Sequence, residues 1–470
     1  MPGRRDYKPH WIYRQTVICD RQTIQSRQVG IDDPVADFYC PSALIQHSLP
    51  GGRHEVDRRD EHQQLDSMCK EAKVEFGSSS RPAPVQSVPL LDVTRGNQPL
   101  LDSIKETFAE ICESGWFIGG PHCKNLEQLV AEKCDTEFAV GCASGSDALL
   151  LALMAINLQP GDEVIVPSFT FFASISAITR LGGTPVFVDI NPRTFNMNPA
   201  LIPELITDKT RAIMPVHLFG RCADMVAINE IARQHDLRVI EDAAQSIGAS
   251  CEGHRACSMS DVGCISFYPT KNLGAFGDAG MIATNDGQLA DRIRRLANHG
   301  MQPRYYHSEI GINSRLDAMQ AAVLGIKIGQ LQRYSAMRSR NADTYRKFLV
   351  ASGLSGYLTL PECDTHSQHV WNQYTIRVPD GRRDEIRQFL SDRKIGTEIY
   401  YPVPMHQQDC FEYLGYRLGS LPETERAARE VLSLPIFPEL TSGEIRFVVD
   451  GLADSLAAGR SHEYERRKAS

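Results

Sequence analysis

The sequence predicts an α/β fold in which a large domain, built on a mostly parallel seven-stranded sheet, precedes a smaller α+β C-terminal domain. Seven short apolar runs between residues 138 and 284, among them EVIVPSF and TPVFVDI, carry this prediction, and amphipathic stretches such as ADMVAINEIARQH lie between several of them. Apolar strands that alternate with helices are typical of a parallel sheet covered on both faces. Right-handed crossovers place the strand carboxyl ends along one edge, where open α/β folds bind ligands.

The chain divides into three parts by composition. Residues 1–87 mix both charge signs, hold few apolar clusters and lead into GSSSRPAPVQSVP, so we expect a disordered extension. Residues 88–335 carry the regular alternation and form the expected large domain. A long helical stretch from about Arg315 to Leu349 leads into residues 336–470, where short strands (QYTIRVP, GTEIYYP) and a helix (RDEIRQFLSDR) predict the smaller domain.

Bulk properties exclude several classes of protein. A formal net charge of -8 gives no electrostatic reason to expect nucleic acid or an anionic membrane as a partner. No apolar run approaches the roughly 20 residues that span a bilayer, and the first residues, MPGRRDYKPHWIYRQ, lack the apolar segment of a secretory signal. The 13 cysteines show no CxxC pairs and no metal-ligand spacing, so we expect reduced thiols, no metal site and a cytoplasmic location.

The first motif with chemical content is GCASGSDALLLAL, residues 141–153, in which a strand ends, a small-residue turn follows and an apolar helix begins. Ser144, Gly145 and Ser146 stand at the expected helix start, where free backbone N–H groups and the positive end of the helix dipole favour a phosphate. Ser146 adds a hydroxyl donor, and Gly145 allows close approach of the backbone. Taken alone, the motif is equally compatible with a serine-capped helix.

The second motif, RVIEDAAQSIGA at residues 238–249, is an apolar strand that ends in two carboxylates. Successive strand side chains point to opposite faces, so Glu241 and Asp242 cannot serve the same site, and we select Asp242. A carboxylate at this edge can bond the protonated ring nitrogen of pyridoxal phosphate and keep that ring an effective electron sink. By itself, the motif favours a metal-binding or solvated carboxylate.

The third motif, CISFYPTKNLGAFGDAGMI at residues 264–282, runs from a strand into Lys271 and a glycine-rich turn. A Schiff-base lysine must react as its neutral amine, whereas an ordinary lysine is mostly charged at neutral pH. An isolated loop lysine is usually exposed to solvent. Lys271 and Asp242 end consecutive expected strands, however, so both should face the same edge. Together with the phosphate turn, they predict a pyridoxal-phosphate site with Lys271 and Asp242 as catalytic residues.

Two supporting residues complete the expected pocket. Phe171, in PSFTFFAS, follows a strand and can stack on the pyridine ring, although an ordinary core aromatic is the alternative. Ser266 precedes Lys271 by five residues and can supply a further phosphate hydroxyl. Its alternative role is a strand hydroxyl that is bonded locally.

These residues resemble the DegT/DnrJ-type aminotransferases that act on nucleotide-linked keto sugars. The likeness runs from about Val88 to Leu452, and eight marks occur in the same order: SGWFIGGP, SGSDALLLAL, PSFTFFAS, EDAAQSIGA, SFYPTKNLGAFGDAG, GINSRLDAMQAA, YYPVPMH and LPETERAAREVLSLPIFP. The resemblance implies a fold-type I enzyme, assembled as a homodimer with shared active sites.

The resemblance also implies roles for single residues. Lys271 matches the lysine that forms the internal Schiff base, and Asp242 matches the aspartate that bonds the ring nitrogen. Gln245 falls where a glutamine lies beside the ring and its hydroxyl, and Asn313, in GINSRL, matches an asparagine that reaches the phosphate from the neighbouring subunit. The remaining matches are the stacking aromatic Phe171 and the phosphate contacts Gly145, Ser146 and Ser266.

The reaction that the resemblance implies is transamination of a nucleotide-linked keto sugar, with glutamate as the amino donor, for surface polysaccharide or secondary-metabolite biosynthesis. KNLGAFGDAG and WNQYTIRV are more similar to relatives that aminate the sugar 3-position than to those that aminate the 4-position. Arg315 and His406 are candidate substrate contacts, and each is equally compatible with a structural role.

Three alternatives remain open at this point. A non-catalytic, pyridoxal-phosphate-binding regulator would keep the fold but lose the lysine or the carboxylate, and both are present. A deoxysugar dehydratase of the same family carries histidine in place of the lysine, so Lys271 argues against that branch. A nucleotide-binding oxidoreductase would also have a parallel sheet, but no strand here is followed by GxGxxG.

Overall fold

The computed structural model describes residues 85–363 and 367–469, with side chains up to residue 458. The expected extension, residues 1–87, lies outside the described residues except for its last three. The described chain forms one compact unit. Among its helices, none is both long enough and apolar enough to cross a membrane.

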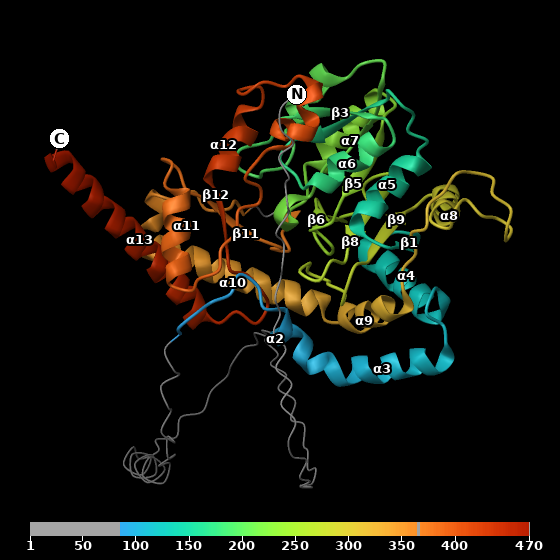
Figure 1. The fold of residues 1–470 in the computed structure, drawn as a ribbon, viewed down its shortest axis with the longest axis horizontal. Coiled ribbons are helices and arrows are strands. Elements are labelled where there is room, and N and C mark those ends of the chain that lie inside the picture. Colours follow the sequence, from blue (N-terminus) through green and yellow to red (C-terminus); the bar gives the residue numbers. More distant parts are fainter. Residues whose placement is uncertain (1–84, 364–366, 470) are drawn as a thin grey trace, which may run out of the picture. The chain divides into compact units, whose positions relative to one another are not determined.

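A seven-stranded sheet forms the centre of the fold (Figure 1). Its strands lie in the order β1-β9-β8-β5-β4-β2-β3. β9 runs antiparallel to both neighbours and the other pairs are parallel, which confirms the mostly parallel sheet. Each apolar run supplies one strand: β1 (Phe138–Cys142), β2 (Glu163–Pro167), β3 (Thr184–Val188), β4 (Thr210–Ile213), β5 (Arg238–Asp242), β8 (Val262–Ser266) and β9 (Gly280–Thr284).

Helices cover both faces of this sheet, because its strands are apolar on both sides. The helices on one face are α5 (Gly145–Ala155), α6 (Phe172–Arg180) and α8 (Gly287–Leu296). Those on the opposite face are α4 (Gly120–Cys134), α7 (Met225–Gln234) and α9 (Ala318–Ile328). α3 (Leu101–Ser114) packs on α9 from outside (Figure 1). Asp242 therefore points to the α5 and α6 side of β5, and Glu241 points to the other side.

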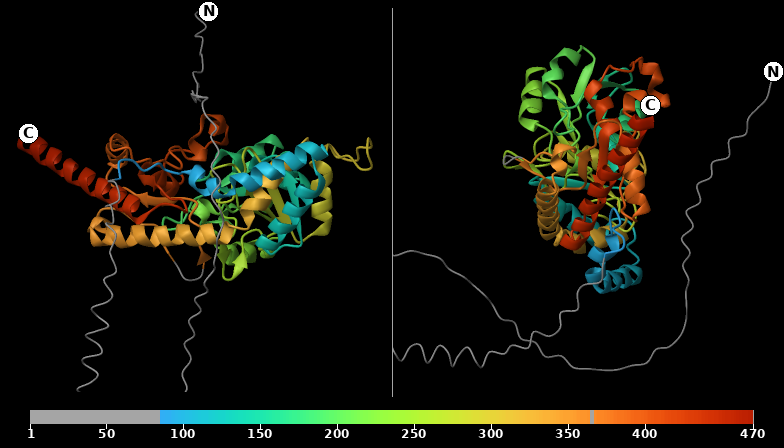
Figure 2. Two further views of the ribbon diagram at one scale, coloured as in Figure 1. Left: turned by 90° about the horizontal axis from the view of Figure 1, so that it is seen from below. Right: turned by 90° about the vertical axis from the view of Figure 1, so that its left-hand side faces the viewer.

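The C-terminal part has its own core around a two-stranded antiparallel sheet, β11 (Tyr374–Arg377) and β12 (Val431–Leu434). The surrounding helices are α10 (Leu331–Ala351), α11 (Arg383–Asp392), α12 (Pro422–Glu430) and α13 (Ser442–Ala469). Figure 2 shows α10 from a second side, where it runs into this part of the chain. Val88 pairs with Ile395 and joins the same core. The expected domain boundary at 335/336 falls inside α10, a continuous helix. The division into these two domains stays a prediction.

Two expected elements differ in the structure. The stretch from Arg315 to Leu349 is two helices, α9 and α10, because the chain breaks at Gly329, a poor helix former. The expected strand GTEIYYP is wrong: only Glu398 pairs, in an isolated bridge with Ser433, and Tyr401 packs against aromatic side chains instead.

The remaining elements are α2 (Val93–Asn97), β6 (Ser250–Cys251), β7 (His254–Arg255), β10 (Ser367–Gln368) and the 3₁₀ helices η1 (Gln98–Leu100), η2 (Pro199–Leu201), η3 (Pro203–Leu205), η4 (Leu218–Gly220), η5 (Leu354–Gly356), η6 (Met405–Gln407) and η7 (Asp409–Leu414).

Candidate active site

β5 and β8 are parallel neighbours, so their carboxyl ends lie at the same edge of the large sheet. Asp242 ends β5 in register with Cys264 of β8, and Lys271 follows the end of β8 by five residues. The structure thus brings the expected carboxylate and lysine together, and the charge of Asp242 acts on the Lys271 amine.

Asp242 is a buried carboxylate with few hydrogen bonds for its charge. Its Oδ2 accepts from Ser174 Oγ of α6 at 2.7 Å, and its Oδ1 accepts from Ala244 N at 3.2 Å. Burial raises the pKa of the Asp242 carboxyl, while the Ser174 and Ala244 hydrogen bonds and the Lys271 charge act in the opposite direction. A cationic partner beside Asp242 would therefore stabilise the ionised form of this buried carboxyl.

The Lys271 side chain is largely buried, and its amine has no hydrogen-bond or ion-pair partner in the described part of the chain. Loss of hydration lowers the pKa of the amine to about 8, although the charge of Asp242 opposes this shift. A larger fraction of Lys271 is therefore neutral near pH 7 than of an exposed lysine, as a nucleophilic amine requires.

The loop that carries Lys271 is held rigidly from behind. Gly274 makes the tight turn possible, because a Cβ there would lie 2.3 Å from Pro269 O. Three hydrogen bonds from neighbouring elements fix the loop: Lys327 Nζ to Gly274 O at 2.5 Å, Asn272 Nδ2 to Val370 O at 2.8 Å, and Phe276 N to Gln320 Oε1 at 2.8 Å.

The predicted phosphate turn lies against the last residue of β8, Ser266, and the first residue of β9, Gly280. A Cβ at Gly145 would come within 2.6 Å of Ser266 Cβ, and one at Gly280 within 2.3 Å of Ser144 O. Ser144 caps α5 by accepting from Asp147 N at 3.1 Å, so its hydroxyl serves the helix. Ser146 is exposed, and Ser266 Oγ lies beside Gly145. The turn forms a glycine-lined cradle with one exposed hydroxyl, the form that a phosphate group needs.

Gln245 and Phe171 lie near an aromatic residue that the sequence did not single out, Tyr401. Gln245 Oε1 accepts from Phe219 N at 2.6 Å, and its Nε2 donates to Tyr401 Oη at 3.3 Å. Phe171 is 57% exposed, and its ring centroid lies 6.1 Å from that of Tyr401. The only sequence signal for Tyr401 is its position in YYPVPMH, which carries no recognisable chemistry of its own.

Asn313 and Arg315 are both exposed, whereas Ser314 between them is buried. Ser314 Oγ donates to Asp147 Oδ2 at 2.7 Å and accepts from Ala143 N at 3.1 Å, which ties this segment to the start of α5. Since side chains alternate along an extended segment, Asn313 and Arg315 share the outward face. Neither is among the described contacts of Asp242 or Lys271.

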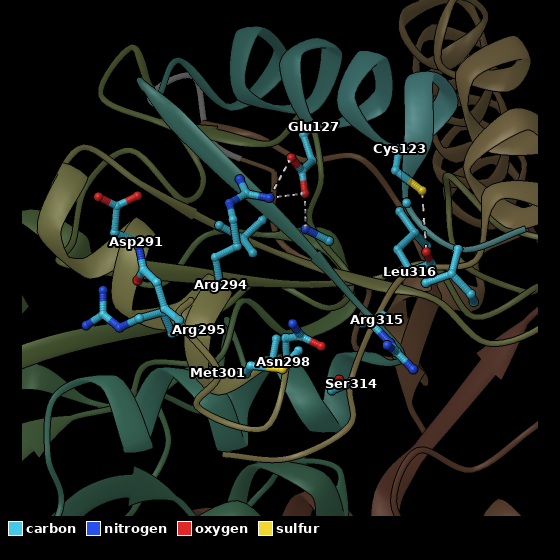
Figure 3. Close-up of a pocket in the computed structure, with 16 residues that line it drawn as sticks. Cys123, Glu127, Asp291, Arg294, Arg295, Asn298, Met301, Ser314, Arg315 and Leu316 are labelled. Carbon is cyan, nitrogen blue, oxygen red and sulfur yellow. Dashed lines mark hydrogen bonds and ion pairs between the residues drawn. The ribbon is translucent and has the colours of Figure 1, made fainter. Parts of the chain in front are cut away.

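Arg315 instead borders a cavity of about 370 Å³ that Lys271 and Asp242 do not line (Figure 3). Glu127 accepts from Arg294 Nη1 at 3.1 Å and from Gly141 N at 2.9 Å along its wall. Within this wall Glu127 and Arg294 form an ion pair. Because neither Lys271 nor Asp242 lines the cavity, it is distinct from the lysine–carboxylate cluster of the same chain.

His406 is buried, and both of its ring nitrogens are engaged. Nδ1 lies 2.7 Å from Ser168 Oγ, and Nε2 lies 3.3 Å from Glu425 Oε1. Burial lowers the pKa of His406, against the opposing effect of Glu425. As placed, His406 offers no free ring nitrogen to a substrate, which favours its structural alternative.

A sheet of this topology, with a lysine and a carboxylate at the ends of neighbouring parallel strands, is the architecture of the fold-type I aminotransferases. The sequence matches the DegT/DnrJ/EryC1/StrS aminotransferase family over residues 100–453. The chain belongs to this family, which confirms the resemblance that the motifs indicated. By fold and family the protein is an enzyme of the aminotransferase class.

Similar proteins carry two kinds of name. A "pleiotropic regulatory protein" from Geobacillus stearothermophilus is 47% identical over 368 residues, which cover 78% of this chain and 98% of the relative. A UDP-N-acetyl-3-dehydro-alpha-D-glucosamine 3-aminotransferase from Acidithiobacillus ferrooxidans is 45% identical over 76% of this chain and 95% of its own length.

Solved structures agree with this placement. DesV from S. venezuelae, in complex with a ketimine intermediate, is 41% identical with a TM-score of 0.76, and the match covers 79% of this chain and 98% of that one. NtdA from Bacillus subtilis, with bound cofactor PMP, is 34% identical with a TM-score of 0.74, over 80% and 86% of the two chains. These relatives were therefore solved in states of pyridoxal-phosphate chemistry.

Proposed function

We propose that this protein transfers an amino group from glutamate to a nucleotide-linked 3-keto sugar, with pyridoxal 5'-phosphate as cofactor. The observation that carries the proposal is the buried and unpaired amine of Lys271 in the field of Asp242. Burial of a lysine without a partner opposes folding, and proteins retain such groups mainly where the neutral amine is needed.

The residues at the sheet edge fit the proposed cofactor. Lys271 Nζ would bond its aldehyde carbon, Asp242 would accept from its protonated ring nitrogen, Gln245 would face its ring hydroxyl, and the exposed Phe171 would cover one face of the ring. The cradle that a Cβ at Gly145 or Gly280 would fill supports this assignment. The phosphate would be held by the start of α5 with Gly145, Ser146 and Ser266.

The bound cofactor supplies an electron sink for the carbon that loses a proton. Lys271 Nζ would anchor the cofactor and, once an amino donor had displaced it, its neutral amine would take and hold the proton from the donor's α-carbon. Asp242 would keep the ring nitrogen protonated, because its buried charge favours a cation beside it. The same residues act in reverse order when the keto sugar enters.

The choice of a 3-keto sugar rests on KNLGAFGDAG and WNQYTIRV and on the name of the A. ferrooxidans relative, which is a 3-aminotransferase. Glutamate as donor, and a role in polysaccharide or secondary-metabolite biosynthesis, are part of the same proposal. Arg315 is the candidate contact for an anionic part of the substrate, since its guanidinium is exposed.

We infer that the active enzyme is a homodimer. Asn313 and Arg315 point outward together, so they suit contacts with a neighbouring subunit better than contacts within their own. Asn313 would then complete the phosphate site of the partner. Exposed aromatic side chains on neighbouring segments support an interface: Trp116 and Phe117 precede the bridge between Ile118 and Asp317, and Tyr305 and Tyr306 lie in the loop before Asn313.

A regulatory role is the second candidate, since a relative at 47% identity is named a pleiotropic regulatory protein. Such a protein could bind the cofactor and still not transfer an amino group. Lys271 and Asp242 favour catalysis over this role, and Lys271 also argues against a dehydratase of the same family.

The visible absorption spectrum tests the proposal. We expect the purified protein to take up pyridoxal phosphate, to absorb in the visible, and to lose this band when glutamate is added. Nucleotide-linked 3-keto and 4-keto sugars are then compared as acceptors, and faster recovery of the band with the 3-keto sugar is expected. A protein that takes up no cofactor contradicts the proposal, and one whose band glutamate does not bleach supports the regulatory alternative.

A further inference from the structure

Directly behind Asp242, on the other face of β5, lies a buried carboxylate that the proposed reaction does not use. Glu241 is 0% exposed and accepts four hydrogen bonds. None of its described donors is a lysine or an arginine; they are His217 Nε2 at 2.7 Å, Cys257 N at 2.7 Å, Met259 N at 3.1 Å and Ser260 Oγ at 2.7 Å.

His217 makes hydrogen bonds through both ring nitrogens and links the Glu241 carboxylate to the backbone of Asp242. Its Nδ1 accepts from Ala223 N at 3.1 Å, so Nε2 carries the ring proton and donates it to Glu241. The backbone N–H of the same residue donates to Asp242 O at 3.0 Å. His217 therefore holds two successive residues of β5, one by its ring and one by its backbone.

The hydrogen bonds of Glu241 reach both strands that carry the candidate catalytic residues. Asp242 N donates to Pro215 O at 2.8 Å, so the segment before His217 also pairs with the end of β5. Cys257, Met259 and Ser260 belong to the turn that leads into β8, which ends just before the Lys271 loop. Glu241 thus ties the 215–217 segment, β5 and the entry to β8 to one point.

Stability alone does not account for this arrangement. Burial of a carboxylate costs free energy that neutral hydrogen bonds offset only in part, and an apolar residue at the same position is often as stable or more stable. The hydrogen bonds of Glu241 instead fix the register of β5 against its neighbouring segments. Asp242 and Glu241 are adjacent carboxylates, and a slip of one residue in β5 would turn Glu241 to the site and Asp242 away from it.

We propose that Glu241 and His217 are positioning residues that select Asp242, of the two adjacent carboxylates, as the partner of the cofactor ring nitrogen. This proposal rests on the pyridoxal-phosphate site proposed above. Both carboxylate oxygens of Glu241 already accept hydrogen bonds from protein donors, so Glu241 has no free oxygen for the cofactor. It contributes to the reaction by placing Asp242.

The test compares Glu241→Gln with Glu444→Gln. Glu444 is a matched control, because it is also buried and accepts four hydrogen bonds, from Arg95 and Thr441, far along the chain from the site. Each protein is loaded with pyridoxal phosphate labelled with ¹⁵N at the ring nitrogen. We expect Glu241→Gln to shift the ¹⁵N resonance toward the unprotonated ring and Glu444→Gln to leave it as in the wild type.

Kinetics per bound cofactor give a second measurement. Glu241→Gln should lower kcat by about tenfold to a hundredfold, the loss typical of a misplaced catalytic group, with KM for the keto sugar little changed. In an Asp242→Asn background the same substitution should have no further effect, because the group it positions has lost its charge. An additive loss, or a ¹⁵N resonance equal to that of the wild type, overturns the proposal.

A folding defect is separated by a second variant. His217→Gln keeps a neutral donor near Glu241 but cannot reproduce both ring contacts, so it should give the same ¹⁵N shift in a protein whose circular dichroism matches the wild type. A wild-type protein that takes up no cofactor overturns both this proposal and the proposed function. A wild-type protein that transaminates while both variants behave like it overturns this proposal alone.

Discussion

Two lysines at the loop that follows β8 are similarly buried but have different surroundings: Lys271 lies on the loop, and Lys327 of α9 contacts it from behind. Lys271 and Lys327 are both largely buried, and burial lowers the pKa of each to about 8. Lys327 Nζ donates to Gly274 O and lies 5.6 Å from the centre of the Phe276 ring. The Lys271 amine has no such partner among the described residues. Burial and a lowered pKa therefore do not identify a reactive lysine; the unpaired amine does.

The different surroundings of the two lysines indicate a structural role for Lys327 and a chemical role for Lys271. Lys327 faces the back of the loop, where Glu439 is the opposing charge, and it holds the Gly274 carbonyl. Lys271 faces the sheet edge, where Asp242 is the opposing charge. One lysine fixes the turn, and the other is thereby presented to the site on a rigid backbone.

The largest expected effect is that of Lys271→Ala. Its transaminase activity per folded protein should fall by about 10⁴-fold, because no other amine can take and return the proton. Lys327→Met should lose less than about tenfold, because it loosens the loop but leaves the reactive amine in place. Single-turnover reactions with glutamate measure both. Added methylamine should restore part of the activity of Lys271→Ala only, and equal losses in the two variants would contradict the comparison.

Asp242→Asn should follow, with a loss of about 10²- to 10³-fold in kcat, as for removal of one electrostatic contact to the reacting group. The amide keeps the shape and the Ser174 hydrogen bond but has no charge to keep the ring nitrogen protonated. Glu439→Gln is the counterpart on the Lys327 side, and its kcat should change less than about threefold. Steady-state kinetics at saturating glutamate compare the two, and a larger loss in Glu439→Gln than in Asp242→Asn reverses the assignment.

The sequence predicts much of the fold because the sheet strands are apolar runs that local composition reveals. It also places Asp242 and Lys271 at one edge, since both follow such runs. It does not predict the loss of the expected strand at GTEIYYP, because that outcome depends on the aromatic contacts that Tyr401 makes with distant segments. The break at Gly329, by contrast, has a local cause that glycine's low helix propensity signals.

The candidate site shows the same division. The motifs located Gly145, Ser266 and Lys271, whose proximity follows from strand order. Nothing in the motifs distinguishes Lys327 from an exposed helix lysine, since its partner Gly274 O is a backbone atom 53 residues away. His406 likewise stands in a motif, yet its buried contacts with Ser168 and Glu425 come from tertiary structure alone.

Stability should distinguish the two lysines in the cofactor-free protein. Their folded-state pKa values lie below the ordinary value of 10.5, so the unfolded chain binds more protons between about pH 8 and 10.5 and stability rises with pH across that window. The penalty is fully present below pH 8. Lys271→Met should therefore stabilise the protein at pH 7 by about 3 kcal/mol, since the Lys271 pKa lies about 2.5 units below 10.5 and each pKa unit is worth about 1.4 kcal/mol.

Lys327→Met should gain less than Lys271→Met, because it also leaves the Gly274 carbonyl without its partner, which costs about 1–3 kcal/mol. Urea unfolding at pH 7 and pH 10 measures both variants, and the difference between each variant and the wild type should shrink at the higher pH. Equal stabilities for the two variants at pH 7 would show that the hydrogen bond of Lys327 contributes nothing.

The smallest effect should come from Ser174→Ala, which acts on the charge that Lys271 faces. The Ser174 hydroxyl lowers the pKa of Asp242 by bonding its ionised form, so its removal should raise that pKa further. The acid limb of the kcat/KM profile should move to higher pH, with a loss of only about two- to fivefold at pH 7.5, the scale of one hydrogen bond of about 0.5–1 kcal/mol. Ser176→Ala is the matched control, since its hydroxyl lies on the same helix and donates to Ala173 O, with no contact to Asp242 among the described residues. A less ionised Asp242 also favours the protonated form of the cofactor-free Lys271 less than a charged one does, so the Lys271 pKa should fall while that of Lys327 stays in place. An acid limb that does not move in Ser174→Ala would mean that Asp242 is not the opposing charge which sets Lys271 apart from Lys327.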